Sequence, residues 1–221
     1  MTEHSESSVG AAEGERLDFS LGGWVKANVI GLGVTYGLFA LLGDIAEFGL
    51  GVAHESLVRN FALLVAVIAG ASWFMRLRRR VIARHVQDSR TVALAAATGL
   101  SLGLITGFAV GGPPLDFVLG AIALGTIGGT FLWRQLRNRV RRPGGLLLAS
   151  IGGWILAGLV AGAVAFIGDP LHELVGAPQD GTVSGSVFFV SLLALIGMVG
   201  GLVGGWIEGA ALRRRLGHRT T

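Results

Sequence analysis

Six long apolar stretches, separated by short polar segments, constrain the fold of this chain more than any other feature. A helix needs roughly 20 apolar residues to cross a bilayer, at a rise of about 1.5 Å per residue. The stretches predict six membrane-spanning helices, at Gly22–Gly43, Phe61–Met75, Thr91–Val110, Phe117–Trp133, Leu146–Ile167 and Val187–Ile207. The second stretch is the least certain membrane span, because arginines border it on both sides. Side chains at both ends must extend (snorkel) to the headgroups if it is to cross the bilayer.

Composition supports a membrane protein and excludes several other classes. Of the 221 residues, 52% are hydrophobic, 14% are charged and 37 are glycine. An average soluble domain is about 25% charged and about 7% glycine, so a soluble enzyme or a disordered chain is excluded. The chain has no cysteine, which excludes disulfides and thiolate metal sites. The expected fold is therefore an all-α polytopic bundle of six transmembrane helices.

The arginines indicate how the bundle is oriented. The second, fourth and sixth stretches each run into an arginine cluster, and Arg59 is the one basic residue expected on the opposite side. The clusters contain Arg76, Arg78, Arg79 and Arg80; Arg134, Arg137, Arg139, Arg141 and Arg142; and Arg213, Arg214 and Arg215. Basic loops remain in the cytoplasm, so we expect both termini inside, with these arginines setting topology or holding anionic headgroups. We expect the cytoplasmic membrane of a prokaryote.

The six helices are expected to form three hairpins, at 21–84, 91–142 and 145–216. Together they make one membrane domain, 21–216, between a disordered acidic tail at 1–20 and a cytoplasmic tail at 217–221. The outer turns Phe39–Gly51 and Phe108–Gly120 are identical at six of thirteen positions, and Gly22-Gly23-Trp24 recurs as Gly152-Gly153-Trp154. Two explanations remain open, triplication of a two-helix unit or a looser common composition.

Glycines recur at every fourth position on two of the helices. The series are Gly99, Gly103, Gly107 and Gly111 on the third, and Gly197, Gly201, Gly205 and Gly209 on the sixth. Residues four apart share one face of a helix, so each series forms a smooth stripe that lets another backbone approach closely. We expect a glycine zipper here, in which the stripes make the tightest contacts, either with each other or with the helices of a partner.

Few acidic residues are placed where they could form a site. Asp44, Asp116 and Asp169 sit at the outer turns, where they form either a ring of carboxylates that attracts cations or ordinary turns and caps. Glu208 lies late in the last stretch, where it either pairs with Arg76 or Arg134 or forms a proton or cation site.

Enzyme motifs are absent from the sequence. The five histidines are scattered, no H-E-x-x-H or G-x-S-x-G sequence occurs, and the single lysine, Lys26, excludes a phosphate-binding loop. We therefore expect no catalytic residues, no metal ligands and no cofactor.

The run Gly23–Gly31 and the glycine-rich helix that closes on Leu212–Arg215 carry a resemblance. They resemble uncharacterised glycine-rich bacterial polytopic membrane proteins, whose hairpins repeat tryptophan, alanine, asparagine and glycine. The resemblance implies no activity.

Two functional hypotheses follow. The first is a tightly packed accessory or structural subunit without enzymatic activity, which associates with itself or with other membrane proteins in the lipid bilayer. The second is a channel or transporter for small solutes or cations. A nucleic-acid partner is not expected, because the basic residues are accounted for by membrane topology.

Overall fold

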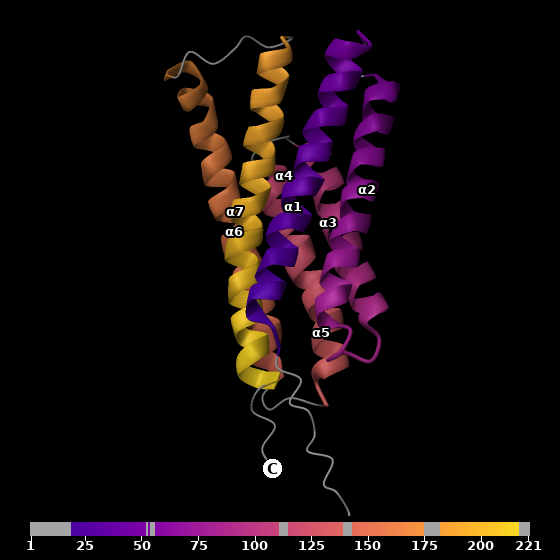
Figure 1. The fold of residues 1–221 in the computed structure, drawn as a ribbon, viewed down its shortest axis with the longest axis vertical. Coiled ribbons are helices and arrows are strands. Elements are labelled where there is room, and N and C mark those ends of the chain that lie inside the picture. The colour runs from indigo at the N-terminus through magenta and orange to yellow at the C-terminus, as the bar shows by residue number, and fades with distance from the viewer. Residues whose placement is uncertain are drawn as a thin grey trace, which may run out of the picture.

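The computed structural model describes residues 19–51, 53, 56–110, 115–138, 143–174 and 182–216; for 116 and 168–174 it describes the backbone alone. The elements within these residues are all helical, and they form six rods long and apolar enough to cross a membrane (Figure 1). The prediction of an all-α fold with six apolar spans is confirmed.

The rods are longer than the apolar stretches that predict them. Two contain a π-helical turn: α1 (Leu21–Asp44) continues into η1 (Ile45–Gly49), and η2 (Leu124–Gly128) joins α4 (Leu115–Ala123) to α5 (Gly129–Leu136). The other rods are α2 (Leu57–Ile82), α3 (Ser89–Val110), α6 (Gly144–Leu174) and α7 (Val183–Leu216).

The second rod departs most from its prediction. Instead of ending near Met75, α2 runs for 26 residues through its arginine cluster to Ile82. Arginine is a good helix former, and cations near a helix C-terminus are favourable. At the other end Ser56 accepts a hydrogen bond from the backbone N–H of Arg59 at 3.2 Å, which caps the helix. The helix is therefore long enough to cross a membrane, with arginines near both of its ends.

A cap also fixes the start of α3. The backbone N–H of Thr91 donates to Asp88 Oδ1 at 3.0 Å. Side-chain and backbone hydrogen bonds from Thr91 lower the pKa of the Asp88 carboxyl below its ordinary value, because they favour its charged form. The short loop between α2 and α3 thus contains an acidic helix cap among its arginines.

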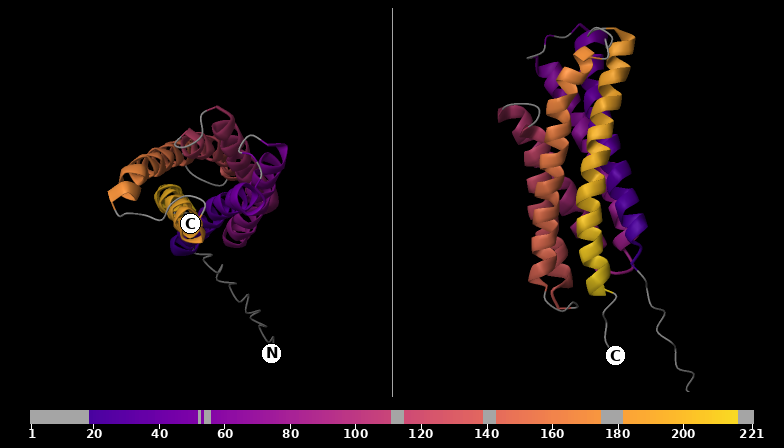
Figure 2. Two further views of the ribbon diagram at one scale, coloured as in Figure 1. Left: turned by 90° about the horizontal axis from the view of Figure 1, so that it is seen from above. Right: turned by 90° about the vertical axis from the view of Figure 1, so that its left-hand side faces the viewer.

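The six rods form a closed ring. Each rod packs against its neighbours along the chain, and the contact between α1 and α7 closes the circle (Figure 2). That closing contact is the most extensive of all the interhelical contacts. The division into three hairpins stays a prediction, because the packing within each expected pair does not set it apart from the rest of the ring.

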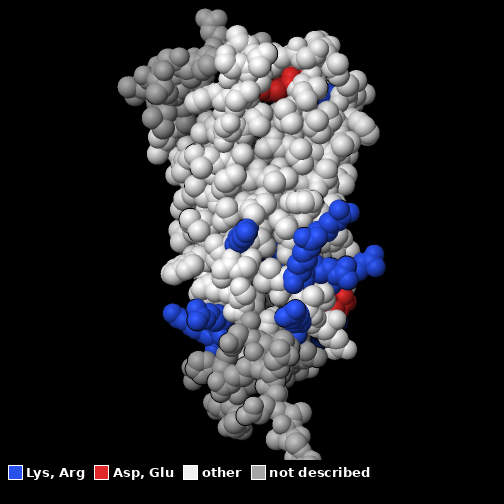
Figure 3. All heavy atoms as spheres, viewed as in Figure 1, with Lys and Arg blue, Asp and Glu red and all other residues white. Residues whose placement is uncertain are grey.

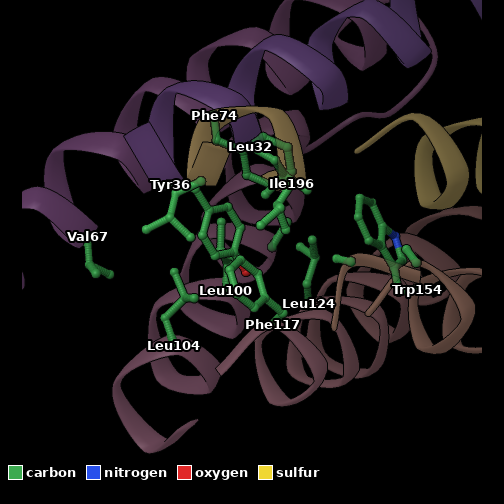
Figure 4. Close-up of a cluster of buried hydrophobic side chains, with 14 of the residues drawn as sticks. Leu32, Tyr36, Val67, Phe74, Leu100, Leu104, Phe117, Leu124, Trp154 and Ile196 are labelled. Carbon is green, nitrogen blue, oxygen red and sulfur yellow. The ribbon is translucent and has the colours of Figure 1, made fainter. Parts of the chain in front are cut away.

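Apolar side chains fill the ring in two clusters. The first draws on all six rods, and within it Tyr36 stacks on Phe117 with ring centroids 4.7 Å apart (Figure 4). Its larger members are Leu32, Tyr36, Val67, Phe74, Leu100, Leu104, Phe117, Leu124, Trp154, Leu193 and Ile196. The second lies at the end where α2, α5 and α7 finish, and it includes Phe19, Trp24, Ile82, Leu132, Leu136, Leu146 and Leu212.

The two glycine stripes face different neighbours inside the ring. On α7, a Cβ at Gly201 would lie 2.5 Å from the carbonyl oxygen of Asn28, so this stripe packs on α1. On α3, a Cβ at Gly99 would lie 2.5 Å from the carbonyl oxygen of Ala123, so that stripe packs on α4 and η2. The expectation that the stripes meet each other or a partner is wrong for these positions. Gly111 lies outside the described residues.

Candidate functional site

The basic side chains gather at one end of the ring, here called the arginine-rich end (Figure 3). Most of them are exposed there, as expected of arginines that reach water or headgroups. The exposed arginines are Arg76, Arg79, Arg80, Arg84, Arg90, Arg134, Arg137, Arg213 and Arg214, while Arg215 is half-buried. Arg139, Arg141 and Arg142 lie outside the described residues.

Arg78 is the exception, because it points into the ring. Its exposed fraction is 1%, and its Nη2 lies 2.8 Å from Glu208 Oε2 on α7. On α2 it shares one face with Gly70, Phe74 and Ile82, which are four residues apart in succession and all buried. The expectation that Arg78 holds headgroups is therefore wrong, because this inward face carries it into the interior.

Glu208 is fully buried, and both of its carboxylate oxygens are held. Ser150 Oγ donates to Oε1 at 2.7 Å, while Arg78 Nη2 and Trp154 Nε1 donate to Oε2 at 2.8 and 3.3 Å. The sequence suggested Arg76 or Arg134 as the partner, and both of these are exposed. Arg76 is two residues from Arg78, about 200° around the helix, which turns it away from the ring.

Aromatic rings enclose the Arg78 guanidinium. Its Cζ lies 4.3 Å from the ring centroid of Trp24, 5.3 Å from Phe74 and 5.9 Å from Trp154. Such cation–π contacts stabilise a desolvated arginine by roughly 2 kcal/mol. The cluster of Arg78, Glu208, Ser150, Trp24 and Trp154, with Phe74 and Asn28 at its border, is called the inner polar cluster below.

The two tryptophans come from the repeated Gly-Gly-Trp sequence, one on α1 and the other on α6. Each of them also meets a glycine of α7. A Cβ at Gly209 would lie 2.7 Å from Trp24, and one at Gly204 would lie 2.5 Å from Trp154. The repeat is the sequence signal that marks these site residues, although it does not by itself associate them with Arg78.

The inner polar cluster lies between the two apolar clusters of the core. Phe74 and Trp154 belong to the first apolar cluster and Trp24 belongs to the second. Arg78 is four residues, about 6 Å, from the end of α2, and Glu208 is eight residues, about 12 Å, from the end of α7. The ion pair therefore lies inside the ring, with apolar side chains of the core on both sides.

Some polar atoms of the cluster have no hydrogen-bond partner. Among buried side chains these are Nε and Nη1 of Arg78, Nε1 of Trp24 and Oδ1 of Asn28. Asn28 uses its amide Nδ2 to donate to the carbonyl oxygen of Trp24 at 2.8 Å. A buried donor without a partner costs about 1–3 kcal/mol, so the cluster is not optimised for stability alone.

A π-helical turn borders the cluster on the side of α6. Ser150 Oγ lies 3.5 Å from the carbonyl oxygen of Gly125, which belongs to η2. A π-helical turn redirects backbone carbonyls, and such turns are frequent at functional sites. Ser150 can therefore reach two acceptors, the Glu208 carboxylate and this carbonyl.

No known family, curated protein or solved structure matches this chain.

A second ion pair lies at the end opposite the arginine-rich end. Arg59 Nε is 3.2 Å from Glu47 Oε2 in η1, and the Arg59 guanidinium lies 5.7 Å from the Phe108 ring centroid. Asp44, which the sequence places in an outer carboxylate ring, is half-buried at the end of α1. The side chains of Asp116 and Asp169 lie outside the described residues, so the ring itself stays a prediction.

Proposed function

We propose that this protein is an integral membrane protein without enzymatic activity that acts as a tightly packed accessory or structural subunit. The observation that carries the proposal is the filled interior of the ring. Side chains from all six rods meet in the first apolar cluster, and the second closes the arginine-rich end. Such an interior favours a solid packing element over an open conduit.

The proposal places partner contacts on the outward faces of the rods. The glycines of α7 already face α1 and α6, so they are not free for another protein. The outward faces expose large apolar side chains instead, among them Leu57 and Phe61 on α2 and Phe166 on α6. In lipid, packing rather than hydrophobicity drives helix association, so shape complementarity at these faces would select the partner.

Extraction in a mild detergent tests this function. We expect the purified protein to elute as a homo-oligomer or with a co-purifying membrane protein, measured by size exclusion with light scattering and by mass spectrometry. A lone monomer without any partner, both in detergent and in native lipid discs, contradicts the proposal.

The buried Arg78–Glu208 pair favours a second function, the transport of a small solute or ion. Charged side chains inside a membrane are costly, and they usually mark a pathway or a coupling site. A cation site at Glu208 is disfavoured, because Arg78 already occupies the cation position at 2.8 Å. Flux into reconstituted liposomes above that of empty vesicles, and altered by Glu208→Gln, supports transport; unaltered or absent flux contradicts it.

A further inference from the structure

The inner polar cluster has more unpartnered donors than acceptors. Arg78 retains the N–H of Nε and both N–H groups of Nη1, and Trp24 retains its indole N–H. Against these stands one unpartnered acceptor, Oδ1 of Asn28, which lies one helical turn from Trp24 on α1. Glu208 already accepts from Ser150, Trp154 and Arg78 Nη2, and it makes no hydrogen bond to the other donors.

A ligand for these donors must offer acceptors, and it must be small. The Arg78 guanidinium carbon lies 4.3 Å from the Trp24 ring centroid, so both sets of free N–H groups belong to side chains in direct contact. Charge-assisted N–H donors of this kind bind anions more strongly than neutral acceptors. A halide or a small carboxylate has the required chemistry.

Charge balance adds a condition. The Arg78–Glu208 pair is neutral, so an added anion would leave a net negative charge in an apolar surrounding, which is unfavourable. That charge is cancelled if Glu208 takes up a proton when the anion binds to Arg78. Arg78 from α2 is the charged group within ion-pair distance of Glu208 among the described residues, and the groups facing it from α6 are the neutral Ser150 and Trp154.

The surroundings of Glu208 can accommodate the proton. A protonated Glu208 can donate its O–H to Ser150 Oγ, and Ser150 can turn its own O–H toward the Gly125 carbonyl in η2, 3.5 Å away. Hydroxyl groups both donate and accept, so this exchange of roles leaves no new buried donor without a partner. The π-helical turn supplies the acceptor that the exchange needs.

We propose that Arg78 and Trp24 form a binding site for a small monovalent anion, which is taken up together with one proton on Glu208. This site extends the proposed function without depending on it, because binding does not require that the anion cross the membrane or that a partner protein be present.

The test measures anion binding to the full chain in lipid nanodiscs. Replacing Trp73, Trp133 and Trp206 by Phe leaves Trp24 and Trp154 as fluorescent reporters at the site. Chloride or acetate is exchanged for bulky gluconate at constant ionic strength, from pH 5 to pH 8. In this background we expect saturable fluorescence changes, with an affinity that falls by up to about tenfold per pH unit as the pH rises, because each bound anion is taken up with one proton.

Variants separate the site from the arginine-rich surface. Glu208→Gln removes the counter-charge, so this variant should bind both anions more tightly at pH 8 and lose the pH dependence. Arg78→Gln should abolish the response, while Arg76→Gln, an exposed arginine on the same helix, should leave it unchanged.

Several outcomes overturn the proposal. If water alone occupies the site, exchanging gluconate for chloride will not change the fluorescence of the protein with the three Trp→Phe replacements. The same exchange will not change the fluorescence of its Glu208→Gln variant. A response that is lost in Arg76→Gln would assign binding to the surface. If Arg78→Gln does not fold, Glu208→Gln still decides, because a purely structural ion pair predicts no gain in anion affinity in that variant.

Discussion

Desolvation dominates the energetics of Arg78 and Glu208. Removing two charges from water costs several kcal/mol per ion, and their attraction recovers this only with good geometry and further hydrogen bonds. Glu208 has those hydrogen bonds, whereas Nε and Nη1 of Arg78 do not. The pair therefore specifies which side chains meet across the ring more than it adds to stability.

Removing one member of the pair should be far more harmful than removing both. We expect Arg78→Met or Glu208→Leu alone to lower the free energy of unfolding by about 3–5 kcal/mol, because each leaves a buried charge uncompensated. The double variant should recover most of this loss. Thermal unfolding in detergent with gluconate as the only anion measures the cycle; additive losses in the double variant would show that the two side chains act independently.

At the scale of elements, the glycines of α7 determine how closely it approaches α1. The positions Gly197, Gly201, Gly205 and Gly209 each face a residue of α1, and Gly204 faces Trp154 on the other side. The helix is thus fitted between two neighbours, with a separate set of small residues for each.

An added methyl group on this face should destabilise the ring. At Gly201 a Cβ would meet the Asn28 carbonyl oxygen at 2.5 Å and the Val29 Cα at 2.9 Å, and a backbone cannot rotate away as a side chain can. We expect Gly201→Ala to cost about 1–3 kcal/mol, the usual range for overpacking. The measurement is the unfolding midpoint in detergent.

Gly152→Ala is the matched control for that measurement. Gly152 is exposed and lies away from the ends of α6, and a Cβ there would meet nothing within 4 Å. Alanine is the better helix former by about 1 kcal/mol, so this variant should be neutral or slightly stabilising. Equal losses in the two variants would refute the packing explanation for Gly201.

The sequence predicted the rods well and their partners poorly. Spans are set by local composition, so six apolar stretches sufficed to place them. Which rods touch depends on side chains far apart in the chain, such as Gly201 and Asn28. Arg78 could have been placed inside by continuing the spacing of Gly70 and Phe74 past Met75, but the arginine cluster ended the predicted helix early. No pattern in one sequence pairs Arg78 with Glu208.

For the molecule as a whole, we expect the arginine-rich end to determine its orientation in the membrane. Ala83, after α2, and Thr182, before α7, are both exposed and lie at opposite ends of the ring. The chain has no cysteine, so each position can carry a single one. We expect a membrane-impermeant maleimide to label Thr182→Cys in intact cells and Ala83→Cys only after permeabilisation, because basic loops remain inside. The reverse pattern would invert the topology.

The closing contact between α1 and α7 has a consequence for biosynthesis. Arg78 leaves the ribosome 130 residues before Glu208 and so enters the membrane without its counter-ion. Chains are made from the N-terminus, and α7 is the last rod to arrive. Until α7 arrives, the Arg78 guanidinium lacks the carboxylate that it contacts in the finished ring. The same step that closes the ring therefore also supplies the counter-charge of Arg78.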